Sequence, residues 1–297
     1  MLALLAARWR RGRAPLGGTF LQFWAEHLKW EAERWERLFG YLAALRAKEL
    51  VVQWSGYDGI DYGPLVEKVL ELAEEGGMRV RVGLRHESGW WKDVEESPSA
   101  ALRRLEARAA EVDRRWCASV GRRKAFAGWY LPEEIDDVHW RGREAGEGLG
   151  ETVRAVRRKV GRLAASGFAS GAAEPGELAA FWRGLARRSG LEEVLFQDGI
   201  GAGKTSLETW PGYAAALARG LGRRFRVVVE TFEASPGPGE FRAAPAGVER
   251  VLEQCRVAAK YSRKAALAFS MPEYYTPEGG AVAAARYHEY LSRMDRI

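Results

Sequence analysis

Two neighbouring carboxylates, Glu133 and Glu134, follow an apolar run that is rich in aromatic residues. The run, residues 125–131, has the length and composition of a buried strand, and Pro132 with the acids behind it supplies turn chemistry. Adjacent residues of a strand point to opposite faces, so we expect the two glutamates to have different roles. A solvated acidic turn would have the same composition, so the remaining chain has to distinguish a site from a surface.

A third carboxylate, Glu230, ends another apolar run at residues 225–229. Glycoside hydrolysis needs one carboxyl that protonates the leaving oxygen and a second that attacks the sugar or activates water. In retaining enzymes these two carboxyls lie about 5–5.5 Å apart. Glu134 and Glu230 could perform this chemistry if the fold brings the ends of their strands together.

The alternation of strands and helices along the chain would meet this condition. We expect strands at residues 17–24, 50–54, 79–84, 125–131, 167–170, 194–197, 225–229 and 265–270. Helices are expected at residues 27–47, 64–75, 98–119, 150–165, 175–188, 207–221, 246–261 and 280–293. This α/β pattern predicts a (β/α)8 TIM barrel that forms a single domain over residues 17–297, preceded by an N-terminal extension at residues 1–16. A doubly wound open sheet is the alternative, which is weaker because no G-x-G-x-x-G pattern follows the first strand.

In such a barrel the C-terminal ends of all eight strands open on one face. The polar and aromatic residues that we expect there as substrate-binding candidates are Gln22, Trp24, Gln53, Trp54, Arg85, Trp90, Gln197, Asp198 and Tyr274. Flat aromatic side chains can cover the apolar faces of sugars, although they also cap protein cores. Arg85 could pair with a carboxylate in the mouth and lower its pKa, or it could pair with a surface acid.

The fourth predicted strand resembles that of the retaining glycoside hydrolases of clan A, whose pattern is roughly Gly-Trp-x-Leu-x-Asn-Glu-Pro. Residues 128–135 align with this pattern without a gap. The resemblance implies that Glu134 is the acid/base and that Glu230, at the end of the seventh strand, is the nucleophile. Glu133 stands where that superfamily has an asparagine that contacts the sugar 2-hydroxyl, so Glu133 would orient the sugar or tune Glu134.

Six motifs at the predicted strand ends resemble the bacterial barrel family catalogued as domain of unknown function 4434. They are residues 18–22, 52–55, 128–136, 197–199, 229–232 and 269–275. That family is regarded as glycoside-hydrolase-like, which implies an enzyme acting on a bacterial poly- or oligosaccharide. A carbohydrate-binding barrel without turnover is the alternative.

Residues 198–205 nearly match the phosphate-binding pattern G-x-x-x-x-G-K-[ST]. The first glycine of that pattern is replaced by Asp198, whose carboxylate would repel a phosphate. Nucleotide binding through this loop is therefore a further but weaker alternative, and a glycine-rich loop at the barrel mouth is the simpler interpretation. In that case Asp198 would bind a sugar hydroxyl or orient Glu230.

Composition limits the other classes of function. The 297 residues include 46 basic and 40 acidic ones, which are mixed along the helices without a basic stripe, so we expect no nucleic-acid binding. The four histidines are scattered and the two cysteines lie far apart, so we expect no metal and no cofactor. No apolar run is long enough to span a membrane, and arginines follow the short apolar segment at residues 2–7. The sequence as written predicts a cytoplasmic protein, or a periplasmic or extracellular one if a signal peptide precedes this start.

Overall fold

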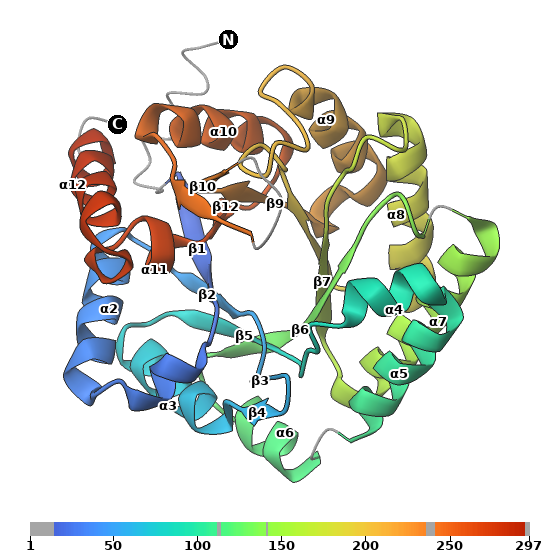
Figure 1. Ribbon diagram of the computed structural model, residues 1–297, viewed down its shortest axis with the longest axis horizontal. Helices are drawn as coiled ribbons and strands as arrows, with labels where there is room; N and C mark the ends of the chain where they lie inside the picture. Colours follow the sequence, from blue (N-terminus) through green and yellow to red (C-terminus); the bar gives the residue numbers. More distant parts are fainter. Residues whose placement is uncertain (1–14, 112–113, 141, 236–240, 295–297) are drawn as a thin grey trace.

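The computed structural model describes residues 15–111, 114–140, 142–235 and 241–294, which form a closed barrel of parallel strands inside a ring of helices (Figure 1). The strand order around the barrel is β1-β12-β9-β8-β7-β6-β5-β2, so that strands neighbouring in the barrel also follow one another along the chain. The predicted (β/α)8 barrel is confirmed and the open-sheet alternative is wrong. Most of the predicted N-terminal extension, including its apolar segment, lies outside the described residues.

The barrel strands are β1 (Leu16–Leu21), β2 (Glu49–Val52), β5 (Arg79–Gly83), β6 (Phe126–Ile135), β7 (Leu163–Gly167), β8 (Glu193–Gln197), β9 (Phe225–Glu230) and β12 (Ala266–Phe269). Two short hairpins lie outside the barrel, β3 (Gly56–Tyr57) with β4 (Ile60–Asp61) and β10 (Phe232–Ala234) with β11 (Ala243–Pro245).

The α-helices are α2 (Ala32–Ala44), α3 (Gly63–Glu75), α4 (Trp90–Glu96), α5 (Pro98–Ala110), α6 (Arg114–Gly121), α7 (Arg143–Val160), α8 (Pro175–Ser189), α9 (Trp210–Leu221), α10 (Val248–Tyr261), α11 (Met271–Tyr274) and α12 (Ala281–Met294). Three short 3-10 helices are η1 (Ala25–Lys29), η2 (Gly222–Arg224) and η3 (Pro277–Gly279). None of the described helices is long and apolar enough to cross a lipid bilayer.

Several predicted elements differ from those observed. The helix expected at residues 27–47 is divided into η1 and α2, and the helix expected at residues 150–165 is α7, at Arg143–Val160. The fifth strand was expected at residues 167–170, but β7 occupies Leu163–Gly167, because α7 ends at Val160 and Gly161 breaks it with a φ of 94°. Alanine-rich segments such as residues 163–166 have no strong strand signal of their own, and the neighbouring strands decide their state. The long helix expected at residues 98–119 is divided into α5 and α6.

The barrel interior contains stacked layers of side chains, because alternate residues of each strand point inward. The middle layer is apolar and consists of Phe20, Val51, Tyr130, Ala164, Leu195, Val228 and Leu267. The residues between them point outward and pack against the helices. This alternation determines which side chains reach the mouth two residues further along each strand.

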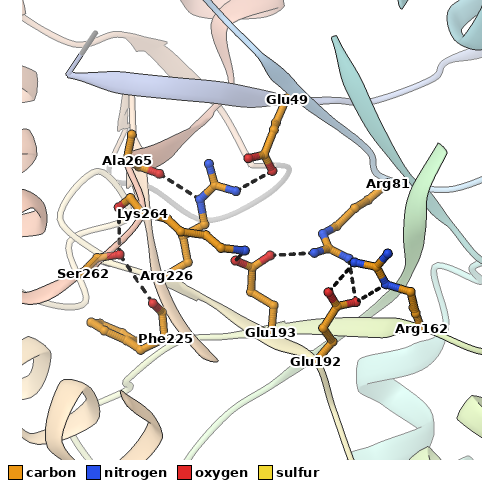
Figure 2. A network of polar contacts seen from close by, with 10 residues as sticks. All are labelled: Glu49, Arg81, Arg162, Glu192, Glu193, Phe225, Arg226, Ser262, Lys264 and Ala265. Carbon is orange, nitrogen blue, oxygen red and sulfur yellow. Dashed lines mark hydrogen bonds and ion pairs between the residues drawn. The ribbon is translucent and has the colours of Figure 1, made fainter. Parts of the chain in front are cut away.

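The opposite end of the barrel is closed by charged residues (Figure 2). We call Glu49, Arg81, Glu193 and Arg226 the barrel floor. Arg226 donates to Glu49 at 2.6 Å, and Arg81 donates to Glu193 at 2.9 Å. Gly128, with a φ of 136°, leaves room for Arg81, because a Cβ at this position would lie 2.9 Å from the guanidinium. Gly128, the first residue of the fourth-strand motif, therefore makes room for the barrel floor and has no part in the mouth.

Candidate active site

A pocket of about 430 Å³ opens at the C-terminal mouth of the barrel. We call it the mouth pocket, and its lining residues are Trp91, Glu134, Asp136, His139, Phe168, Ser170, Gln197, Ala202, Lys204, Glu230, Phe232, Phe241 and Phe269. The two carboxylates predicted from the sequence as a catalytic pair, Glu134 and Glu230, both line it. Its walls combine these acids with aromatic rings, and a largely apolar lining with a few polar groups is typical of small-molecule sites.

The alternation of the strands explains why these side chains point into the mouth pocket. Tyr130 and Val228 belong to the middle layer, and Glu134 and Glu230 stand four and two residues after them on the same strands. Gln197 follows Leu195 of the same layer in the same way. Every second side chain of a strand points to the same face. All three side chains therefore point inward and continue the interior layers into the mouth.

Glu134 is held by one side-chain partner. Gln197 donates from Nε2 to Oε1 of Glu134, which fixes the carboxyl against the wall of the mouth pocket. Burial raises the pKa of Glu134 above its ordinary value. The Gln197 hydrogen bond and the charges of His86 and Lys204 offset only part of this effect.

Glu230 is almost fully buried and receives a backbone donor from the next loop. The amide of Ala202 donates to Oε2 of Glu230 at 2.7 Å. Burial and the neighbouring charge of Asp198 raise the pKa of Glu230, and the charge of Glu134 raises it further. The Ala202 amide and Arg250 oppose this shift without cancelling it.

The glycine-rich loop at residues 198–205 wraps around Glu230. A Cβ on Gly201 would lie 2.3 Å from the carbonyl oxygen of Phe232 and 2.9 Å from Cβ of Glu230, so only glycine permits this approach. The loop amides of Ile200 and Ala202 donate to carboxylates, and α9 begins only at Trp210. A phosphate-binding loop directs its amides at the anion and leads directly into a helix, so this geometry does not fit that alternative.

Asp198 lies behind Glu230 and does not line the mouth pocket. Its Oδ1 accepts from the backbone amides of Glu230 and Ile200, both at 3.3 Å, and its Oδ2 accepts from Gln254 on α10 at 2.6 Å. Burial raises the pKa of Asp198, while these donors lower it in part. The structure therefore corrects the prediction that Asp198 binds a sugar. Its contacts fit the alternative prediction that Asp198 positions Glu230.

Glu133 faces away from Glu134, toward the helix layer. Arg108 of α5 donates to Oε1 of Glu133 at 2.8 Å, and Nδ1 of His86 lies 3.4 Å from the same oxygen. Burial acts to raise the pKa of Glu133, but the contacts with His86 and Arg108 outweigh it and hold this pKa below its usual range. Oε2 of Glu133 is buried without a hydrogen-bond partner among the described residues.

A second group of aromatic residues lies where β1, β2 and β5 end. We call Trp24, Trp54, Tyr57 and His86 the rim cluster. The ring of Trp54 lies 4.7 Å from Tyr57 and stacks on His86 at 5.9 Å, and Trp24 packs edge-on against Trp54. Trp24 remains 37% exposed, whereas Trp54 is buried and donates from Nε1 to the carbonyl of Phe23.

Two predicted glutamines also end strands at this side of the mouth. Gln22 is partly exposed after β1, and Gln53 is buried after β2 with its Oε1 unpartnered among the described residues. Each follows a middle-layer residue by two positions, Phe20 and Val51 respectively. Neither of them lines the mouth pocket. The structure places them beside it, at the ends of β1 and β2 where the rim cluster also lies.

Three predicted substrate-binding residues lie elsewhere. Arg85 is exposed and lines a separate surface pocket with Asp61 and Glu67, because β5 ends at Gly83 and the inward alternation stops there. Trp90 is buried in the core and stacks on Trp140, while the adjacent Trp91 lines the mouth pocket instead. Tyr274 packs against Phe232, 5.5 Å between ring centroids, and so reaches the mouth pocket only through that ring.

Sequence reasoning missed several residues that shape the site. Arg108 and Gln254 lie in helices, where no pattern marks a residue that reaches toward a strand end. His86 could have been found, because it lies two residues after the third predicted strand. Lys204 was noticed only as part of the near phosphate-binding pattern, and His139 is paired at 2.7 Å with Asp136 from the acidic run.

Comparison with known protein families shows to which family this chain belongs. The family described as a domain of unknown function (DUF4434) matches residues 16–280, which is most of the chain. The chain belongs to the DUF4434 family. This DUF4434 member is 27% identical over 232 residues to the uncharacterized protein YbcH of Escherichia coli K12, a match that covers 71% of the chain and 75% of that protein.

Solved structures share the barrel of this DUF4434 protein. A protein of Bacteroides thetaiotaomicron, provisionally described as an α-L-fucosidase, superposes with a TM-score of 0.73 at 19% identity, covering 94% of this chain and 93% of the other. An intracellular xylanase of Thermoanaerobacterium saccharolyticum superposes with a TM-score of 0.53 at 11% identity, covering 87% and 89%. The fold is thus one that glycoside hydrolases use, as the sequence resemblance implied.

Proposed function

We propose that this DUF4434 protein is a retaining glycoside hydrolase that acts on a bacterial poly- or oligosaccharide. The observation that carries the proposal is the presence of Glu134 from β6 and Glu230 from β9 on the walls of one pocket lined with aromatic rings. The likeness to barrels of the hydrolase type supports it, because their described activities all involve glycosidic bonds.

In the proposed reaction Glu230 attacks the anomeric carbon while Glu134 gives its proton to the leaving oxygen. The glycosidic C–O bond breaks as the bond between sugar and Glu230 forms. A water then enters, Glu134 takes one of its protons, and the resulting hydroxide displaces Glu230 with net retention. Atoms balance over the cycle, and both carboxyls return to their starting states.

The proposed division of work sets a condition on the protonation states of Glu134 and Glu230. Burial raises the pKa of both Glu134 and Glu230, and the charge of Glu134 raises the pKa of Glu230 further. Two such groups facing one pocket lose their protons in separate steps, so over an intermediate pH range the pair holds one proton. The first step needs that proton on Glu134, whereas burial and Asp198 raise the pKa of Glu230 to about 8, so substrate binding has to ionise Glu230.

The remaining residues supply binding rather than chemistry. Trp91, Phe168 and Phe241 offer flat surfaces for apolar sugar faces inside the mouth pocket, and Trp24 offers another at the rim cluster. Gln22, which is partly exposed, presents polar atoms beside the pocket, where sugar hydroxyls would bind. In this proposal Glu133, buried against Arg108 and His86, tunes Glu134, which is one of the two roles that its position in the strand motif implied.

The test is a panel of bacterial polysaccharides and aryl glycosides, with the stereochemistry of the first product read by NMR. We expect at least one substrate to be cleaved with retention. Glu230→Ala should abolish turnover and azide should partly restore it, whereas Glu134→Gln should still be glycosylated by substrates with good leaving groups. An inverted product would refute Glu230 as the nucleophile.

A carbohydrate-binding barrel without turnover is the second candidate. The observation in its favour is the shielding of Glu230, which is buried, faces the buried Asp198 and is bonded to the loop. Calorimetry on the same panel separates the two functions. Saturable oligosaccharide binding without cleavage of any member would establish the binding protein.

A further inference from the structure

Lys204 is a cation of the mouth pocket that has no anionic partner in the described part of the chain. Its Nζ lies 3.9 Å from the centroid of the Phe168 ring, and no carboxylate of the described residues comes within the 4.0 Å limit of an ion pair. The ring face attracts the ammonium group but leaves its hydrogen-bond donors unused. Lys204 is exposed to the pocket and to solvent.

The other charged groups of the mouth pocket are already engaged. His139 pairs with Asp136 at 2.7 Å, Glu134 accepts from Gln197, and Glu230 accepts from the amide of Ala202. Lys204 therefore differs from its neighbours in having a full charge and no complementary group of the described residues within ion-pair distance.

The loop holds Lys204 in place before any ligand binds. Its backbone amide donates to the carbonyl of Gly199 at 2.8 Å, and the hydroxyl of Thr205 donates to the carbonyl of Asp198. The same loop is held at Glu230 through Ala202. Ordering of the lysine backbone and its contact with Phe168 reduce the entropy that a ligand would otherwise have to remove.

We propose that the saccharide bound in the mouth pocket carries an anionic group, a carboxylate or a sulfate, which pairs with Lys204 beside the bond to be cleaved. This inference rests on the proposed function in taking the mouth pocket as a saccharide site, and it adds the class of substrate. The ring of Phe168 contacts one side of the ammonium group of Lys204, and the free donors of Nζ bind the anionic group of the sugar. A neutral sugar would leave these donors to water.

A competing explanation is that Lys204 only balances the carboxylates of the pocket. Its charge does lower the pKa of Glu134. In that case removal of the lysine would shift the pH profile and would affect charged and neutral sugars alike. The two explanations differ in whether the ratio of affinities for charged and neutral sugars changes.

The experiment measures binding by calorimetry in a Glu230→Gln background, so that turnover does not interfere. One arm compares oligogalacturonate and oligoalginate with their carboxyl-reduced forms, and the other compares sulfated galactan oligosaccharides with their desulfated forms. We expect one anionic probe to bind about fivefold to tenfold more tightly than its neutral counterpart, since the contact is partly exposed. Lys204→Met should remove this ratio, whereas Lys92→Met, a change of an exposed lysine outside the pocket, should leave it intact.

Each outcome decides the inference. An equal affinity for every anionic and neutral pair, a ratio that persists in Lys204→Met, or no binding of any anionic probe would overturn it. Hydrolysis of neutral members by the wild type would then leave the proposed function standing. Preferential binding of an anionic probe would support the pairing with Lys204. If the wild type cleaves neither that probe nor any other member of the panel, the hydrolase is refuted.

Discussion

The backbone amide of Ala202 donates a 2.7 Å hydrogen bond to Oε2 of Glu230, so a loop after β8 holds the carboxyl that ends β9. The contact depends on Gly201, whose missing side chain lets the loop pass against Glu230 and Phe232. The loop that resembles a phosphate-binding motif in sequence thus serves a carboxylate in the structure.

We expect Gly201→Ala to displace this loop and lower activity. The added Cβ would lie 2.3 Å from the Phe232 carbonyl, so the backbone has to move and the Ala202 amide leaves Glu230. Loss of a hydrogen bond to a charged group costs about 1.5–3 kcal/mol, equivalent to a loss of about tenfold to a hundredfold in kcat/KM. The pKa of Glu230 should rise at the same time, seen in the pH profile. Gly184→Ala, which adds a Cβ in open space, is the control, and equal activities would contradict the role of the loop.

The raised pKa of Glu230 predicts a stability that falls with pH. The folded state keeps the proton of Glu230 where the unfolded chain has lost it, so stability declines as pH rises above about 4.3, the ordinary glutamate value. Glu230→Gln removes this decline and should be more stable than the wild type by about 1 kcal/mol or more at pH 9.

At pH 4 the two proteins should be nearly equal. Urea unfolding at both pH values measures the difference, and Glu96→Gln on the exposed face of α4 is the control. A wild-type advantage that grows with pH would show that Glu230 is not held in its neutral form.

Glu133 behaves in the opposite way, because its pKa is lowered. Its contribution to stability is present above the ordinary glutamate value and is lost as pH falls through the folded pKa. Arg108→Met leaves the buried carboxylate with His86 alone and should destabilise the fold by about 3 kcal/mol at pH 7. The double variant Arg108→Met/Glu133→Gln should recover much of this loss, and strict additivity in urea unfolding would refute the coupling.

The barrel floor should contribute to stability and not to catalysis. Arg226 is 1% exposed and donates to both Glu49 and the carbonyl of Ala265, so Arg226→Met leaves two acceptors without their donor. We expect a loss of about 2–4 kcal/mol in the free energy of unfolding. The kcat of the folded fraction should stay unchanged, since the floor residues stand near the starts of their strands and the mouth pocket lies at the strand ends. A selective loss of kcat would contradict this separation.

The loop at residues 198–205 should not bind nucleotides. Its amides of Ile200 and Ala202 are directed at carboxylates, and Asp198 would repel a phosphate. Titration calorimetry with ATP and Mg²⁺ should give no measurable heat. Micromolar affinity that is lost in Lys204→Ala would favour the nucleotide-binding alternative instead.

The sequence alone determined the barrel and the residues at most of its strand ends. Eight apolar runs alternate with amphipathic helices, and such a pattern can bury its apolar surface as a closed parallel sheet. Within a strand the period of two residues places side chains reliably, which is why Glu134, Gln197 and Glu230 could be assigned to the mouth before the fold was known.

Only the tertiary structure decided what lies beside these strand ends. The period is lost where a strand stops, so Arg85 turned outward and Trp90 entered the core while His86 and Trp91 took the inner positions. Arg108 and Gln254 reach the site from helices that are distant in sequence, and no local pattern records such a contact. The sequence of the loop around Glu230 nearly matches a phosphate-binding pattern. Its role follows from packing instead, because the neighbouring strand sets the direction of its amides.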